Sequence, residues 1–184
     1  MATEQPKFTL IEKDGGFELR DYAPNIVAEV SIRGDQDQAS RQGFRRLAGY
    51  IFGGNQGRQK IAMTAPVTKI AKGETIAMTA PVAMIAGSQD WLVRFTMPSQ
   101  YALTDLPTPN DPAVTLHAMP AQRCAVMRFS GTAGAAQVAE ETRKLRAAVT
   151  ARGLRATGPS SIARYDPPWT LWFLRRNEVM VPVA

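Results

Sequence analysis

Apolar and polar positions alternate along several short segments of the chain, which is the period of a strand that buries one face. In residues 26–32, four apolar side chains at every second position are separated by Val27, Glu29 and Ser31. The same alternation predicts further strands at residues 17–22, 91–97, 114–119, 125–130 and 179–183.

Two segments follow the period of a helix instead. Residues 35–52 carry an apolar stripe of Ala39, Gly43, Phe44, Leu47 and Ile51, and residues 135–152 carry one of Val138, Leu145, Ala148 and Val149. Each helix follows a strand that ends at a glycine, and a further glycine stops each helix. This unit occurs twice, which predicts two pseudo-symmetric repeats. Because strands outnumber helices without regular alternation, we expect an α+β fold with a largely antiparallel sheet and two helices packed on it.

The heptapeptide Ile-Ala-Met-Thr-Ala-Pro-Val occurs at residues 61–67 and again at residues 76–82. Its alternation predicts two strands of one hairpin, joined by a turn at Lys72-Gly73-Glu74 and ending or bulging at the prolines. Met63 and Met78 would then lie in the same phase. Two such strands would form a small apolar surface. This surface suits a flat apolar ligand and equally suits a tightly packed core, and the pattern leaves both interpretations open.

Composition changes this picture little. The chain has 184 residues, 45% hydrophobic and 21% charged, as expected of one soluble domain. Lys and Arg outnumber Asp and Glu by 22 to 16, but they are scattered, and Arg45-Arg46 and Arg175-Arg176 are the only adjacent arginine pairs, so no nucleic-acid-binding stripe is predicted. No segment reaches the ~18 apolar residues of a membrane span, and the N-terminal residues lack the apolar core of a signal peptide. The single cysteine, Cys124, is predicted to be a buried structural thiol, and we expect a cytoplasmic protein.

Several segments, in order, carry a family resemblance. They are Tyr22-Ala23-Pro24, residues 44–55, the two heptapeptides, Val93-Arg94-Phe95-Thr96-Met97-Pro98, Arg128-Phe129-Ser130-Gly131, Ala163-Arg164-Tyr165-Asp166-Pro167-Pro168-Trp169 and Arg175-Arg176-Asn177-Glu178-Val179. Through them the chain resembles the SOUL haem-binding protein family. The resemblance implies a distorted antiparallel β-barrel with two helices and internal pseudo-symmetry, similar to gyrase-inhibitor-like effector-binding domains. It places a single domain at residues 8–184, after a short flexible N-terminus at residues 1–7.

The resemblance also implies that haem or a related tetrapyrrole is bound, without an axial histidine shared by all members. Haem needs an apolar slot for the macrocycle and cations for two propionates. Arg41, Phe44, Arg45 and Ala48 fall at i, i+3, i+4 and i+7 of the first helix and share one flank. In the family a pocket borders this helix, and Arg41 and Phe44 stand at matching positions, although Phe44 and Ala48 replace methionine found in other members. An amphipathic helix with solvated arginines is the alternative interpretation.

Four methionines could ligate iron or line a pocket, although methionine is ordinarily core filler: Met63, Met78, Met97 and Met127. Met63 and Met78 complete the predicted set of haem contacts. His117 is the only histidine and therefore the only imidazole available to iron. It shares the more polar face of its strand with Thr115, so we expect a surface histidine and not a ligand.

An enzyme is not favoured, because the sequence holds no nucleophile elbow, no phosphate-binding glycine loop and no Cys/His metal constellation. Glu178 follows Arg175-Arg176-Asn177, which predicts an ion pair that pins the C-terminal strand. An aromatic cluster near the end of the chain either covers one mouth of the barrel or plugs the core; its members are Tyr165, Trp169, Trp172 and Phe173. Leu171 stands where family members often have proline.

Together these features predict non-covalent binding of haem or a related tetrapyrrole in an apolar pocket, for haem carriage or buffering. One alternative is an effector-binding module for another flat amphipathic molecule. A second is a tetrapyrrole-processing enzyme, which needs a carboxylate or a tyrosine inside the pocket.

Overall fold

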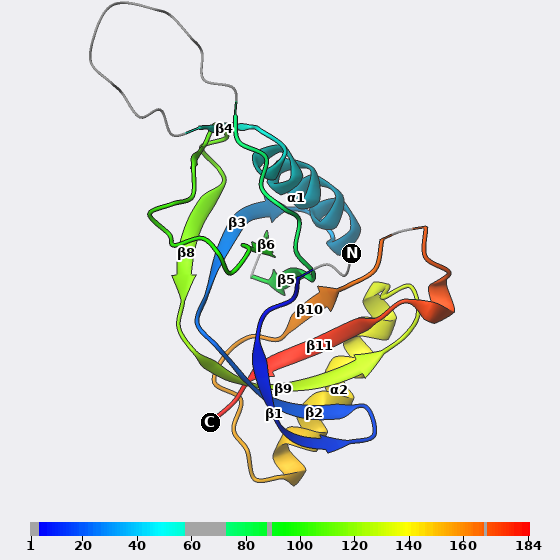
Figure 1. Cartoon of the computed structure of the whole chain (residues 1–184). Helices are drawn as coiled ribbons and strands as arrows, with labels where there is room; N and C mark the ends of the chain where they lie inside the picture. Colours follow the sequence, from blue (N-terminus) through cyan, green and yellow to red (C-terminus); the bar gives the residue numbers. More distant parts are fainter. Residues whose placement is uncertain (1–3, 58–72, 88–89, 168) are drawn as a thin grey trace, which may run out of the picture.

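The computed structural model describes residues 4–57, 73–87, 90–167 and 169–184 (Figure 1). Two helices are present in this part of the chain, α1 (Gln36–Ile51) and α2 (Ala135–Ala151), with a 3-10 turn η1 (Trp172–Leu174). The main sheet contains nine strands: β1 (Phe8–Asp14), β2 (Phe17–Tyr22), β3 (Asn25–Arg33), β5 (Val82–Ala86), β6 (Asp90–Thr96), β8 (Thr115–Met119), β9 (Gln122–Phe129), β10 (Ser161–Arg164) and β11 (Asn177–Pro182). The short strands β4 (Asn55–Gln56) and β7 (Thr108–Pro109) pair separately.

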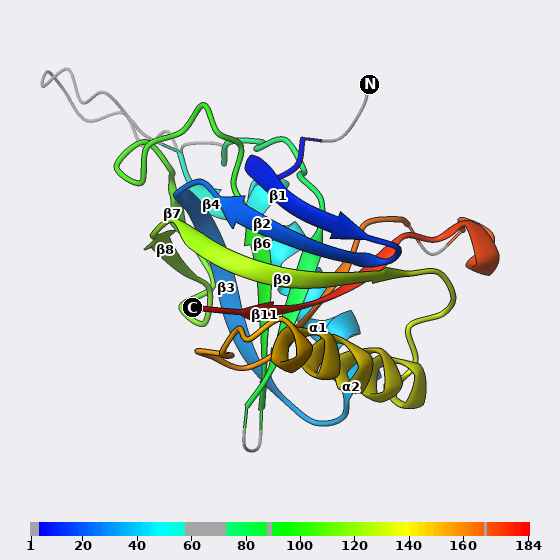
Figure 2. The same ribbon diagram turned by 90° about the horizontal axis from the view of Figure 1, so that it is seen from below.

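The main sheet is antiparallel throughout and has the order β1-β2-β9-β11-β10-β5-β6-β3-β8. It curls into an open half-barrel, and α1 and α2 pack on it (Figures 1 and 2). The expected distorted antiparallel barrel with two helices is therefore confirmed. β1 and β8 form the two edges of the described sheet, so the barrel stays open.

The strand order contains two repeats of one unit, as predicted. In the first unit β3 leads into α1, then β5 and β6, and in the second unit β9 leads into α2, then β10 and β11. β5 and β10 pair with each other at the centre of the sheet, and the order outward from the centre is equivalent on both sides. The strand that precedes each unit is exchanged: β2 pairs with β9, and β8 pairs with β3. This exchange joins the two repeats into one sheet.

Asp35 caps the N-terminus of α1: its carboxylate accepts a hydrogen bond of 2.8 Å from the Gln38 amide and so satisfies one donor of the first turn. The helix packs on β3 and β6 through a buried face that includes Leu47, and burial of one such side chain contributes roughly 1.5–3 kcal/mol. A Cβ atom at Gly43 would lie 2.5 Å from Val93, so glycine lets the helix approach β6 closely. The equivalent helix α2 packs on β9 and β11.

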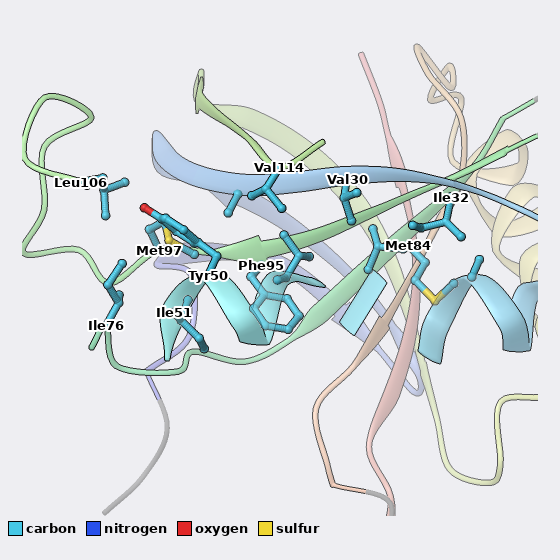
Figure 3. Packing of buried hydrophobic residues seen from close by; sticks show 14 residues of the cluster. Val30, Ile32, Tyr50, Ile51, Ile76, Met84, Phe95, Met97, Leu106 and Val114 are labelled. Atoms are coloured by element: carbon cyan, nitrogen blue, oxygen red, sulfur yellow. The ribbon is translucent and has the colours of Figure 1, made fainter. Parts of the chain in front are cut away.

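Each helix covers its own apolar core. Figure 3 shows the first, which combines Val30, Phe95 and Met84 of the sheet with Tyr50 and Ile51 of α1. The second core lies under α2 and draws on β2, β9, β10 and β11; its fully buried members include Ala125, Leu145, Val179 and Val181. Cys124 is buried in β9, and burial raises the pKa of its thiol to about 11, so the predicted structural thiol is confirmed.

Six of the strands were predicted from the sequence, and one prediction about strands is wrong. The second heptapeptide does not form a strand: only its last residue, Val82, belongs to β5. Residues 76–81 bind other segments instead, because the Ile76 amide donates to the Ile51 carbonyl at the end of α1 and the Ala80 amide donates to the Glu4 carbonyl. The first heptapeptide, with Met63, lies outside the described residues.

No helix in the described ranges is both long enough and apolar enough to cross a membrane.

Candidate functional site

One flank of α1, beside the face that packs on the sheet, stays partly exposed. Ser40, at its start, accepts a hydrogen bond of 3.1 Å from Arg164 of β10, and Ile51, at its end, accepts one of 2.7 Å from the Ile76 amide. Residues four and three positions apart on a helix lie on one side. The start of this line therefore lies beside β10, and the end of the helix lies beside Ile76.

Apolar side chains are accessible along this line. The Phe44 side chain is 41% exposed, and its ring meets the buried ring of Phe95 edge-on, with centroids 5.5 Å apart. Ala48, one turn further along, is half-buried. Met78 lies in the segment that α1 faces and is 38% exposed. A folded protein normally covers such large apolar groups, so their partial exposure marks a surface on which a flat ligand can rest.

Two cations stand beside this apolar line. Arg41 and Arg45 are exposed on α1, one position after Ser40 and Phe44, and neither forms a hydrogen bond or ion pair within the described part of the chain. By contrast, Arg46 on another side of the helix lies 3.4 Å from Asp111. The predicted residues Arg41, Phe44, Arg45 and Ala48, here called the α1 flank, thus lie together, with Met78 on the segment opposite.

The other methionines named from the sequence pack into the cores. Met97 is 4% exposed in the first core, and Met127 packs against the second. Both therefore act as core filler, as expected.

His117 lies on the face of the sheet opposite to α1. Its neighbour Leu116 packs against the core beneath the helix, and successive side chains of a strand point to opposite faces. Its Nε2 atom is 3.2 Å from a carboxylate oxygen of Glu29 and 3.0 Å from the Thr115 hydroxyl, and its side chain is 49% exposed. The predicted surface position is confirmed, and the sheet separates this imidazole from the α1 flank. Among the described residues, no group of three or more His, Cys, Asp or Glu side chains could hold a metal ion.

A buried ionic cluster surrounds Glu178 on the same opposite face. Glu178 accepts hydrogen bonds from the guanidinium groups of Arg20 and Arg176 and from the Tyr165 hydroxyl, at distances of 2.7–3.0 Å. Burial opposes ionisation of Glu178, but these donors hold its pKa below the ordinary value. Burial raises the pKa of Tyr165, and it raises that of Tyr22, which Arg20 also contacts, to about 12.

The sequence predicted an ion pair for Glu178 with a neighbouring arginine, and Arg176 forms it. The Arg20 partner was missed. The alternation along β2 could have indicated it: Phe17 and Leu19 face α2, so Arg20 must point to the opposite face of the sheet, where Glu178 lies. Satisfied hydrogen bonds and opposed charges give this cluster a structural role.

The aromatic cluster near the end of the chain does not plug the core. Trp169, Trp172 and Phe173 are 82%, 60% and 52% exposed. Only Tyr165 turns inward, where it meets Glu178 and where Arg176 stacks 3.9 Å from the ring centroid. The plugging interpretation is therefore wrong, because the turn η1 holds these rings outside the sheet.

Known proteins resemble this chain in both sequence and fold. The model of the SOUL heme-binding protein family matches residues 3–182. Heme-binding protein 1 of Xenopus tropicalis is 28% identical over 178 residues, which cover 90% of this chain and 87% of that protein. Heme-binding protein 2 of Mus musculus is 38% identical over 72 residues, which cover 36% of this chain and 35% of that protein.

Among solved structures, the C-terminal domain of EcmrR superposes with a TM-score of 0.66 and 11% identity, covering 91% of this chain and 96% of that domain. A hydrolase from Listeria innocua gives a TM-score of 0.57 and 12% identity, covering 100% of this chain and 94% of that one. At such identities the likeness shows the fold alone. The match across nearly its whole length shows that the chain belongs to the SOUL heme-binding protein family.

Proposed function

We propose that this protein binds haem, or a related tetrapyrrole, reversibly and without covalent attachment at the α1 flank. The observation that carries the proposal is the partly exposed Phe44 ring beside two arginines that have no partner in the described residues. A haem molecule combines a flat apolar ring with two carboxylates at one edge. The α1 flank offers an apolar surface for the ring and two arginines for the carboxylates.

The spacing of the two cations fits this ligand. Arg41 and Arg45 are four residues apart, so their Cβ atoms are about 5–6 Å from each other on the helix surface. Each guanidinium can donate charge-assisted hydrogen bonds to one propionate, and such bonds are about twice as strong as neutral ones. The apolar line of Phe44 and Ala48 then removes part of the macrocycle from water, at roughly 25 cal/mol per Å² of apolar surface buried.

Iron ligation is not required by this mode of binding. His117 lies on the other face of the sheet, and Met78 is the accessible thioether on the segment facing α1. Haem held mainly by its ring and propionates is exchanged easily, which suits carriage or buffering of haem more than permanent use as a prosthetic group.

A titration separates binding of the ring from binding of the iron. Purified protein is titrated with haem and with iron-free protoporphyrin, following the Soret band of each. We expect both ligands to bind, with affinities within about tenfold of each other, because the ring and the propionates supply most of the contacts. Binding of haem alone would contradict this mode and would require an iron ligand from the protein.

A further inference from the structure

The connection between β10 and β11 projects from the body of the molecule (Figures 1 and 2, orange to red). It carries several exposed apolar side chains. We call residues 169–174 the apolar tip. Five of its six side chains are large and apolar, and each is more than half exposed: Trp169 82%, Leu171 58%, Trp172 60%, Phe173 52% and Leu174 64%. Five adjoining groups of this size form a continuous exposed patch, which in soluble proteins marks a surface for a partner or for lipid.

The tip has a defined conformation. The Leu174 amide donates to the Leu171 carbonyl at 2.9 Å, and the Gly131 amide at the end of β9 donates to the Trp172 carbonyl at 3.1 Å. The rings of Trp172 and Phe173 pack edge to face with centroids 5.6 Å apart. Since these side chains are already ordered in the exposed position, little conformational entropy remains to be lost on docking.

Arginines lie at the base of the tip. A hollow of about 390 Å³ separates η1 from the end of β9, and its lining includes Arg128, Arg175 and Arg176. Arg128 is exposed, and its side chain forms no hydrogen bond or ion pair with any described residue. The acidic groups nearby are engaged: Asp166 accepts from the Arg176 amide at 2.6 Å, and Glu178 is fully buried. The base of the tip therefore presents positive charge to its surroundings.

We propose that the apolar tip inserts into the interfacial layer of a bilayer that contains anionic phospholipids, while the hollow at Arg128 receives a lipid phosphate. Tryptophan rings favour the headgroup region, and Phe and Leu favour the acyl chains below it. Each cation near an anionic bilayer surface contributes attraction, and the net charge of +6 acts in the same direction. A convex projection suits a deformable bilayer better than a peptide, which needs a groove. This inference is independent of haem binding.

The test is co-sedimentation of the whole protein with lipid vesicles, read together with tryptophan emission. Vesicles of phosphatidylcholine are compared with vesicles of equimolar phosphatidylcholine and phosphatidylglycerol. Two of the three tryptophans lie in the tip, and Trp91 is half-buried in the sheet. We expect the protein to sediment with the anionic vesicles, with a blue shift of the emission, and to be released by added salt.

Variants then locate the contact. Trp169→Ser/Trp172→Ser should weaken binding to anionic vesicles by about tenfold or more, and Arg128→Glu should weaken it to a smaller extent. Phe52→Ser, which removes an apolar side chain that is 62% exposed after the end of α1, is the matched control and should bind as the wild type does. Thermal melts confirm that each variant is folded.

Three results would overturn the proposal. The first is failure of the wild type to bind either kind of vesicle. The second is equal binding by wild type and the tryptophan variant. The third is concentration-dependent dimerisation without lipid that the tryptophan variant abolishes, measured by sedimentation velocity, because it would assign the tip to a second copy of the chain.

Discussion

Arg20 of β2 and Glu178 of β11 are joined by two hydrogen bonds of 2.8 and 2.9 Å, although 158 residues separate them in the sequence. The strand β9 lies between them, so the arginine reaches across a neighbouring strand. Both side chains are almost completely buried, at 1% and 0% exposure. The pair connects β2, the strand exchanged from the first half of the chain, to the last strand of the second repeat.

Replacing Glu178 by glutamine should destabilise the protein strongly. The change removes the fully buried counter-charge of Arg20 and leaves Glu18, which accepts a hydrogen bond of 2.7 Å from Arg20 Nε, as the remaining carboxylate. Breaking a buried pair typically costs about 3–5 kcal/mol when no other counter-charge remains, so we expect a loss near the lower end of that range. Urea unfolding followed by circular dichroism measures the effect. Asp21→Asn is the matched control, since it breaks the exposed Asp21–Arg123 pair between β2 and β9 and should leave the midpoint almost unchanged. Similar midpoints for the two variants would contradict a structural role for the cluster.

The stabilisation that the Glu178 carboxylate provides should decrease in acid. The pKa of Glu178 is lowered in the folded protein, so its contribution to stability is fully present above the ordinary value of 4.5 and is lost as pH falls through the lower folded value. We therefore expect the stability difference between wild type and Glu178→Gln to shrink as pH is lowered from about 7 to about 3, as measured by urea unfolding at each pH. A difference that stays constant over this range would mean that the carboxylate titrates normally.

Reversing the charges on the α1 flank should weaken haem binding. Arg41→Glu/Arg45→Glu places two carboxylates where the propionates are expected, and we predict a loss of tenfold or more, about 1.4 kcal/mol or above. Thermal melts should hardly change, because both side chains are exposed and unpaired in the described structure. A Soret titration measures the affinity, and binding by the wild type should also weaken with salt.

The control for this variant carries the same change in net charge on the other repeat. Arg146→Glu/Arg155→Glu alters two exposed arginines, one on α2 and one shortly after it. It should leave haem affinity near the wild-type value. If both double variants lose affinity equally, overall charge and not the α1 flank controls binding.

Replacing His117 by alanine should have little effect on haem. The imidazole lies on the face of the sheet away from α1 and contacts Glu29 and Thr115. We expect the haem affinity to stay within about threefold, a change of roughly 0.65 kcal/mol. A Soret titration measures the affinity. Loss of the haem spectrum in this variant would contradict the prediction and would make His117 the axial ligand.

The sequence by itself determined the features that depend on local periodicity. Both helices, six strands and the repeated unit of strand and helix were predicted, because a period of 3.6 or 2 shows which side of an element is buried. It also brought Arg41, Phe44, Arg45 and Ala48 to one flank, since positions on a single helix need no tertiary information. Three strands of the main sheet escaped prediction for equally local reasons: β1 is exposed along its whole length, β5 is a short apolar run, and β10 has only four residues.

Only the tertiary structure decided which elements meet. Periodicity does not name a strand's neighbour, so it could not reveal that β2 and β8 are exchanged between the repeats, or that Arg20 reaches Glu178. Residues 76–81 have the alternation of a strand, yet hydrogen bonds to the end of α1 and to Glu4 take up backbone groups that a strand would use for pairing. The aromatic residues after β10 have a core-like composition, but the turn that displays them holds them outside the sheet. In each case the outcome depends on contacts between residues far apart in the chain, which local patterns do not encode.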